Sequence, residues 1–268
     1  MSGSHRLRFM PIIGIMLGLS LLTGCAIDKG SALAADFAED WAGTPDVVDV
    51  QTTKNNTLPF LGTATGTLTV GDGTPADRVA GLAEEMRKYV AAHDNVTGQI
   101  AADGITFIVV ADRERATETV TLWRSLAADD RVTGADIDDV SSKDGDGWRI
   151  EIISRDAGAA LAIFKDMVAD GDRHQPLSDV TDVKVGTASG GRPGLVVQTD
   201  HQGTVPTDAI AAYEAVRARY AIVRASLEPD RARIVVVAGA DREHAEELAR
   251  AAAPSLGAAL EVVSDRDS

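Results

Sequence analysis

The sequence predicts an α+β fold built from repeated strand–helix–strand units. Five segments place apolar residues three and four positions apart, as a helix lying on a sheet does. Short segments rich in valine and isoleucine flank each of them. Asp-Gly and Gly-Gly pairs, which tolerate the positive φ of tight hairpins, separate successive strands. Together these three observations indicate hairpins and helices that alternate along the chain.

The helices are predicted from their apolar stripes. A short helix precedes the first unit, because Leu33, Phe37 and Trp41 lie on one helical face and Gly43 and Pro45 would end it. Each later helix has charged residues opposite its stripe. These helices are expected at residues 76–92, 112–128, 156–169, 206–220 and 241–253.

The strands are predicted in pairs joined by tight turns. We expect them near residues 47–53, 65–70, 96–101, 105–110, 134–140, 148–153, 179–187, 194–199, 221–227, 232–238 and 259–263. The turns include Asp103-Gly104, Gly190-Gly191 and the segment 228–230. Strands across such turns are expected to be antiparallel.

An internal repeat is visible in the residues themselves. The run Ala-Asp-Arg-Glu at 111–114 recurs at 240–243, and each copy follows a Val-Val strand. The separation corresponds to three units of about 43 residues, a period typical of repeat architectures. Asp77, Asp112 and Asp241 stand at strand-to-helix junctions, where an aspartate caps a helix N-terminus. We therefore interpret these aspartates as helix caps.

The repeats suggest a division into domains. Each strand–helix–strand segment is half of a ferredoxin-like βαββαβ domain, with antiparallel sheets and helices on one face. The predicted division is a tether with a short helix at 25–45, an incomplete first domain at 46–104, a second at 105–190 and a third at 191–268. The alternative is one continuous sheet of five units, because the chain alone does not fix how the halves pair.

The N-terminus has the pattern of an export signal. Arg6 and Arg8 precede an apolar run from Met10 to Leu22. As a helix this run would span about 20 Å, which is short of the ~30 Å hydrocarbon core of a bilayer. It is therefore interpreted as a cleavable signal. The run Leu22-Thr23-Gly24-Cys25 that follows resembles the lipobox of bacterial lipoprotein signal peptides.

The lipobox resemblance covers the first 25 residues and implies a location. It implies that residues 1–24 are removed and that the Cys25 thiol carries a diacylglyceryl group, which holds the protein at the extracytoplasmic face of the bacterial cell membrane. Two acyl chains give lasting attachment. The alternative is an ordinary secretory signal. Cys25 is the only cysteine, so no disulfide framework is available.

The charge of the chain excludes some partners. Removal of Arg6 and Arg8 with the signal leaves 24 of the 26 basic residues against 41 acidic ones, a net charge of −17. An acidic body lacks the basic footprint that nucleic acid requires. It is also repelled by an anionic membrane, so the lipid is expected to hold it there.

Few residues suggest a metal site. Four histidines remain after the signal segment, at positions 93, 174, 201 and 244; no two of them have the spacing of a helical zinc pair, and we expect them at the surface. Asp139, Asp144 and Asp146 form a weak calcium candidate in a predicted hairpin loop. The loop departs from the EF-hand pattern, which would place Ser142 at position one and Ile153 at position twelve. A solvated hairpin is the expectation.

Other reactive groups are equally sparse. The sequence contains no Gly-x-Gly-x-x-Gly after a strand, and no serine, histidine and aspartate set stands out. Trp123 lies on an apolar helical stripe and is expected in the core. Trp148 opens a strand and is the candidate for an exposed contact residue.

The sequence therefore predicts a lipid-anchored envelope protein that acts as a non-enzymatic binding or scaffold module. Its expected partners are the membrane, through the anchor, and another envelope protein; nucleic acid and cofactors are not expected. The alternative is a lipid-anchored small-ligand receptor or hydrolase with a site between repeats, since folds of this kind host many functions.

Overall fold

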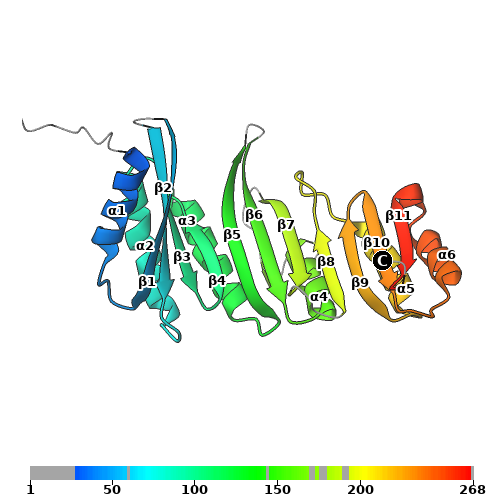
Figure 1. Ribbon diagram of the computed structural model, residues 1–268. Coiled ribbons are helices and arrows are strands. Elements are labelled where there is room, and N and C mark those ends of the chain that lie inside the picture. The colour runs from blue at the N-terminus through cyan, green and yellow to red at the C-terminus, as the bar shows by residue number, and fades with distance from the viewer. Residues whose placement is uncertain are drawn as a thin grey trace, which may run out of the picture.

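Eleven strands form one mixed sheet in which each strand is hydrogen-bonded to the next one in the sequence (Figure 1). The protein is represented by a computed structural model, which describes residues 28–58, 61–142, 145–168, 173–174, 180–188 and 193–266. Cys25 and the signal segment lie outside these residues.

The elements follow one another as hairpin and helix. The strands are β1 (Val47–Leu58), β2 (Leu61–Val70), β3 (Val96–Ala102), β4 (Ile105–Val109), β5 (Val132–Ser142), β6 (Gly145–Ser154), β7 (Val180–Thr187), β8 (Gly194–Gln198), β9 (Ile222–Glu228), β10 (Arg231–Val236) and β11 (Leu260–Ser264). The helices are α1 (Lys29–Trp41), α2 (Ala76–Ala92), α3 (Arg113–Ala127), α4 (Ala157–Val168), α5 (Thr207–Arg217), α6 (Arg242–Ala252) and the 3₁₀ helix η1 (Pro254–Ala259).

Hairpins and helix crossovers give different strand pairings. The strands of each hairpin are antiparallel, from β1–β2 to β9–β10, which confirms the prediction for the hairpins whose turns the sequence indicated, β3–β4 to β9–β10. The strands on either side of each helix, from β2–β3 to β10–β11, are parallel neighbours. The repeating unit is therefore a hairpin followed by a helix, and β11 closes the last unit.

This topology decides between the two predicted architectures. A ferredoxin-like domain separates the two strands of each βαβ unit by another strand. Here those strands are direct neighbours, so the division into tandem ferredoxin-like domains is not confirmed. The prediction of wholly antiparallel sheets was wrong, since the sheet is mixed. The alternative of one continuous sheet of five units agrees with the strand order.

The helices cover one face of the sheet, and the core lies between the two layers (Figure 1). One row of neighbouring side chains shows how continuous this core is. Each member is at most 1% exposed, and burying one such side chain stabilises the fold by about 1.5–3 kcal/mol. The row consists of Leu68, Ile100, Phe107, Ile137, Ile150 and Val183 on six successive strands.

Two glycines allow the helices to approach the sheet closely. Gly66 and Gly98 are paired neighbours on β2 and β3. A Cβ on Gly66 would lie 2.2 Å from the ring of Phe37 in α1, and one on Gly98 would lie 2.5 Å from the sulfur of Met86 in α2. The missing side chains therefore make room for Phe37 and Met86, two large apolar residues of these helices.

The predicted helix caps are confirmed at two of three positions. Asp112 accepts a hydrogen bond from the Arg115 amide at 2.9 Å, and Asp241 accepts one from the His244 amide at 3.1 Å. The interpretation of Asp77 was wrong. It lies inside the first turn of α2, and its carboxylate instead pairs with Arg124 at 2.7 Å.

The tryptophans occupy the core. Trp123 is buried as predicted, and its indole N–H donates to the Ala102 carbonyl at 3.3 Å. The prediction that Trp148 is exposed was wrong, because it shares the strand parity of buried Ile150 and so points toward the helices. The guanidinium of Arg115 lies 4.5 Å from the centre of the Trp148 ring.

Candidate functional site: a charged groove on the open sheet face

The face of the sheet opposite the helices is polar. Side chains alternate between the two faces of a strand, so one row of paired residues crosses this face from strand to strand. Its first residues are small or neutral, and its later ones are charged except for the last, a glutamine. The row consists of Thr69, Ala101, Thr106, Asp136, Glu151, Lys184 and Gln198 on β2 to β8.

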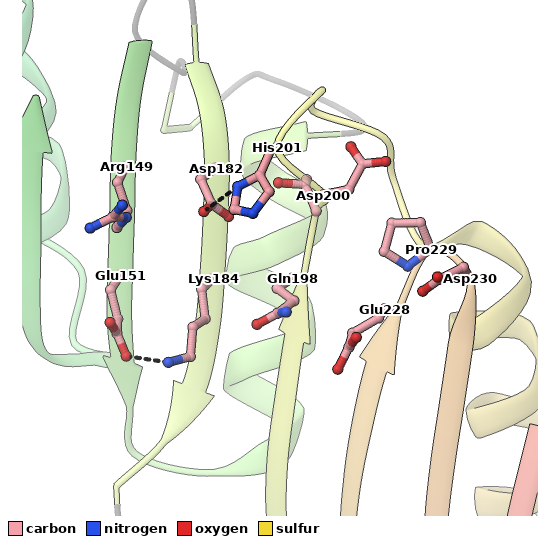
Figure 2. A pocket seen from close by; sticks show the side chains of 11 residues that line it. Arg149, Glu151, Asp182, Lys184, Gln198, Asp200, His201, Glu228, Pro229 and Asp230 are labelled. Carbon is pink, nitrogen blue, oxygen red and sulfur yellow. Dashed lines mark hydrogen bonds and ion pairs between the residues drawn. The ribbon is translucent and has the colours of Figure 1, made fainter. Parts of the chain in front are cut away.

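The charged part of this face contains a concave site. Its volume is about 440 Å³. Figure 2 shows β6 and β7 contributing two side chains each, the end of β8 and the segment after it contributing a polar cluster, and the β9–β10 turn closing the site. The lining residues are Arg149, Glu151, Asp182, Lys184, Gln198, Thr199, Asp200, His201, Glu228, Pro229 and Asp230. We call this site the sheet groove.

Ion pairs across neighbouring strands order part of the sheet groove. The Lys184 ammonium lies 2.7 Å from Glu151 Oε1, on the adjacent strand (Figure 2). His201 Nδ1 lies 3.5 Å from Asp182 Oδ2, although the imidazole is 93% exposed. Pairs that are exposed in this way contribute about 0–1 kcal/mol each to stability. Their main consequence is to fix the positions of charged groups.

Another carboxylate holds the loop that forms one wall. Asp200 accepts hydrogen bonds from the amides of Thr204 at 2.8 Å and Gln202 at 2.9 Å. The Thr204 amide, followed by other donors in the loop, lowers the pKa of Asp200 below its usual value. Asp200 is therefore ionised at neutral pH and keeps His201 at the mouth of the groove.

The sheet groove has an excess of negative charge. It contains five carboxylates, Arg149 and Lys184, which gives a net charge of −3 with His201 neutral. Beside it on β5, the pKa of Asp136 is raised, first by partial desolvation on the sheet and then by the negative charges of Asp138 and Glu151. Such a surface favours a ligand that brings positive charge.

A second cluster of functional groups lies between α3 and the segment that follows α4. Ser125 Oγ is 2.8 Å from His174 Nδ1, and His174 Nε2 is 3.0 Å from Asp129 Oδ2. These contacts have the order serine, histidine, aspartate that activates a nucleophile in many hydrolases. The sequence alone did not indicate this set, because His174 lies 45 residues beyond Asp129 and the three residues follow no local motif.

The chemistry of this cluster favours a structural role. Arg131 binds both oxygens of Asp129 and also Asp166, at 2.7 Å, which lowers the pKa of Asp129 well below its usual range. Ser125 lies in the last turn of α3, where the helix dipole disfavours a developing alkoxide. Its hydroxyl is also 2.7 Å from the Arg173 carbonyl. We therefore interpret the cluster as a latch between α3 and α4.

The other residues singled out from the sequence do not converge. Asp139 pairs with Arg115 at 3.2 Å on the helix side of the sheet, whereas Asp144 and the side chain of Asp146 lie outside the described residues. Within the part of the chain that the structure describes, no three or more His, Cys, Asp or Glu side chains are grouped so that they could hold a metal ion. The expectation that His174 is at the surface was wrong, since it is buried.

A local signal for the sheet groove is present in the sequence. Arg149 and Glu151, like Asp182 and Lys184, are charged residues two apart within a strand, so each pair shares a face. The sequence did not indicate that β6 lies next to β7, which brings the charged residues of the two strands together.

Comparisons with protein-family models, with curated proteins and with solved structures return no match for this chain. Among the described residues, no helix is both long and apolar enough to cross a bilayer. The functional assignment therefore depends on the residues and their geometry.

Proposed function

We propose that this chain is a lipid-anchored binding module of the bacterial cell envelope, and that its sheet groove holds a basic segment of a partner protein. The observation that carries the proposal is the net charge of −3 around a concave site on the open sheet face. The proposed anchor at Cys25 is supported by the sequence of residues 22–25.

The lining of the groove supports a charged occupant. Pockets for drug-like ligands are predominantly apolar with a few polar groups. Here the side chains from the strands are almost all ionisable or amide groups, so an apolar ligand would leave them desolvated and unpaired. Lysine or arginine side chains of a partner would instead form charge-assisted hydrogen bonds to Glu151, Asp182, Glu228 or Asp230.

The size of the groove suits a short segment. It extends across four strands, β6 to β9, and three gaps of about 4.8 Å make about 14 Å. An extended peptide of four or five residues covers that distance at about 3.3 Å per residue. A segment of this size would place two or three basic side chains over the carboxylates.

Binding of a defined probe tests the charge complementarity. We expect the peptide Lys-Thr-Lys-Val-Lys-Thr-Lys to bind the purified protein in calorimetry, and the affinity to fall as salt rises. A peptide with glutamine at each lysine is expected not to bind. Glu151→Gln combined with Glu228→Gln should weaken binding at least tenfold. Glu261→Gln, on the same sheet face but on β11, is the matched control.

Three outcomes would contradict this assignment. One is equal binding of the lysine and glutamine peptides. Another is a loss of affinity with Glu261→Gln as large as with the groove variants. The third is tighter binding of spermidine than of the peptide, which would instead favour a receptor for small amines.

A photo-cross-linking experiment tests the partner in intact cells. A photoreactive residue at Gln198, in the groove, is compared with one at Gln99, on the same face of β3. We expect a discrete cross-linked protein from position 198 alone, joined through a segment rich in lysine or arginine. Identical products from both positions, or an acidic cross-linked segment, would overturn the proposal.

The anchor has its own test. Replacement of Cys25 by serine is expected to move the protein from the membrane fraction to the soluble fraction. A protein that remains in the membrane fraction would refute lipid anchoring at this residue.

A further inference from the structure

The start of α1 is fastened to the end of the β1–β2 hairpin. The Gly30 amide donates to Asn56 Oδ1 at 3.0 Å, and the Lys54 ammonium donates to Ser31 Oγ at 2.6 Å. The Asn56 side-chain amide also donates to the Asp28 carboxylate. These three contacts join residues more than 20 positions apart, so the chain enters the fold beside the last residues of β1.

The backbones of helix and hairpin touch at this corner. A Cβ on Gly62, the second residue of β2, would lie 2.3 Å from the amide nitrogen of Gly30. The contact is possible only because both positions are glycine. The beginning of α1 is therefore held directly against the hairpin rather than through flexible side chains alone.

This attachment fixes where the proposed lipid anchor would emerge. Cys25 precedes Asp28 by three residues. Three residues span at most about 11 Å when extended. Acyl chains on Cys25 would hold the corner formed by the start of α1 and the end of the hairpin within about 11 Å of the lipid.

The described side chains at this corner suit a lipid surface. Leu61, the first residue of β2, is 60% exposed. Lys29 and Lys54 are two of only six lysines in the chain, and both lie here. The nearby Asp28 carboxylate is already bonded to Ser31 and Asn56. The corner is thus basic and apolar, in contrast to the acidic composition of the whole chain.

We propose that the corner formed by Lys29, Lys54 and Leu61 rests on the anionic headgroups of the membrane and sets the orientation of the sheet above it. The inference rests on the proposed function, because it takes Cys25 as the anchor. Lysines close to an anionic surface are attracted within about one Debye length. The leucine side chain enters the interfacial layer, and the rest of the acidic body is held away from the surface.

Fluorescence of single-cysteine variants tests this contact. The full lipidated protein is reconstituted into vesicles of 70% phosphatidylcholine and 30% phosphatidylglycerol. Because acylation blocks the thiol of Cys25, a cysteine introduced by Leu61→Cys is the only one that an environment-sensitive nitrobenzoxadiazole label can reach. Val48→Cys is the matched control, since Val48 is 68% exposed and lies on the neighbouring strand β1, ten residues or about 34 Å from Leu58, the residue that pairs with Leu61.

The expected result is a blue shift of the label at position 61, with quenching by spin-labelled lipid, and no change at position 48. Combined Lys29→Glu and Lys54→Glu should abolish the shift. An unshifted and unquenched label at position 61, or equal shifts at both positions, would overturn the inference. Circular dichroism checks that each variant is folded.

Failure of this inference can be separated from failure of the anchor. Mass spectrometry of the N-terminal peptide reports whether Cys25 is acylated. An acylated protein whose label at position 61 shows no emission shift refutes the membrane contact and leaves the proposed function standing. An unmodified Cys25 refutes the anchor and the contact together, while peptide binding to the sheet groove is measured independently of either.

Discussion

The Nε2 atom of His174 lies 3.0 Å from Oδ2 of Asp129, 45 residues earlier in the chain, and both side chains are buried. The opposite ring nitrogen contacts Ser125 at the end of α3. The helices α3 and α4 belong to successive repeating units. This histidine, together with the ion pair between Arg131 and Asp166, connects the two units within the helix layer.

Removal of the imidazole is expected to destabilise the fold. His174→Ala leaves the buried Asp129 carboxylate and the Ser125 hydroxyl without this partner, which costs about 1–3 kcal/mol of unfolding free energy. Urea denaturation measures the change. His201→Ala is the control, because that side chain is 93% exposed and is expected to change stability by less than about 0.5 kcal/mol. Equal effects of the two variants would refute the latch.

Asp129 makes the stability of the fold depend on pH. Arg131 lowers the pKa of Asp129 in the folded state, whereas the unfolded value is about 3.9. The carboxylate therefore stabilises the fold above about pH 4, and this contribution is lost as pH falls toward the lower folded-state pKa. We expect Asp129→Asn to be less stable than the wild type at pH 7 and the difference to shrink below pH 4. A difference that is constant with pH would contradict this account.

Ionisation of Asp136 has the opposite effect on folding stability. Its pKa is raised in the folded state, so ionisation at neutral pH opposes folding and the cost disappears below the unfolded value. Asp136→Asn is therefore expected to raise the urea midpoint at pH 7 and to leave it unchanged at pH 3. Asp49→Asn, on the same face of β1, serves as the control and should leave both midpoints unchanged. A decrease at pH 7 would show that the crowding of charge around Asp136 is not unfavourable.

The close approach of α1 to the sheet depends on Gly66. Gly66→Ala would place a methyl group against the Phe37 ring, and overpacking of this kind costs about 1–3 kcal/mol. Gly81→Ala is a matched control in α2, where the nearest group is the flexible Arg78 side chain at 3.8 Å. That variant is expected to be more stable by about 0.5–1 kcal/mol, because alanine favours helix. Thermal unfolding measures whether the first substitution lowers stability and the second raises it.

Ser125 is expected to be unreactive as a nucleophile. A fluorophosphonate probe that labels activated serines should leave the wild-type protein unmodified, because Ser125 lies at the carbonyl end of α3 and is 2.7 Å from the Arg173 carbonyl. Labelling that disappears in both Ser125→Ala and His174→Ala would instead establish a hydrolase and overturn the structural interpretation.

Local patterns predicted most of the elements. The helical stripes and the hairpin turns gave segments close to those observed, because each depends on residues a few positions apart. The same locality explains the caps at Asp112 and Asp241. It also explains the error at Trp148, where the strand was recognised but the covered face was assigned incorrectly.

By itself, the sequence determined the alternation of hairpin and helix, the acidic balance of the chain and the absence of cysteines beyond Cys25. Only the tertiary structure decided that the units share one sheet, that Arg149, Asp182 and Glu228 line one groove, and that Ser125, His174 and Asp129 meet. Periodicity depends on residues within one segment, whereas these contacts depend on which strands and helices become neighbours. That choice is made by burial of the continuous apolar face along the whole sheet.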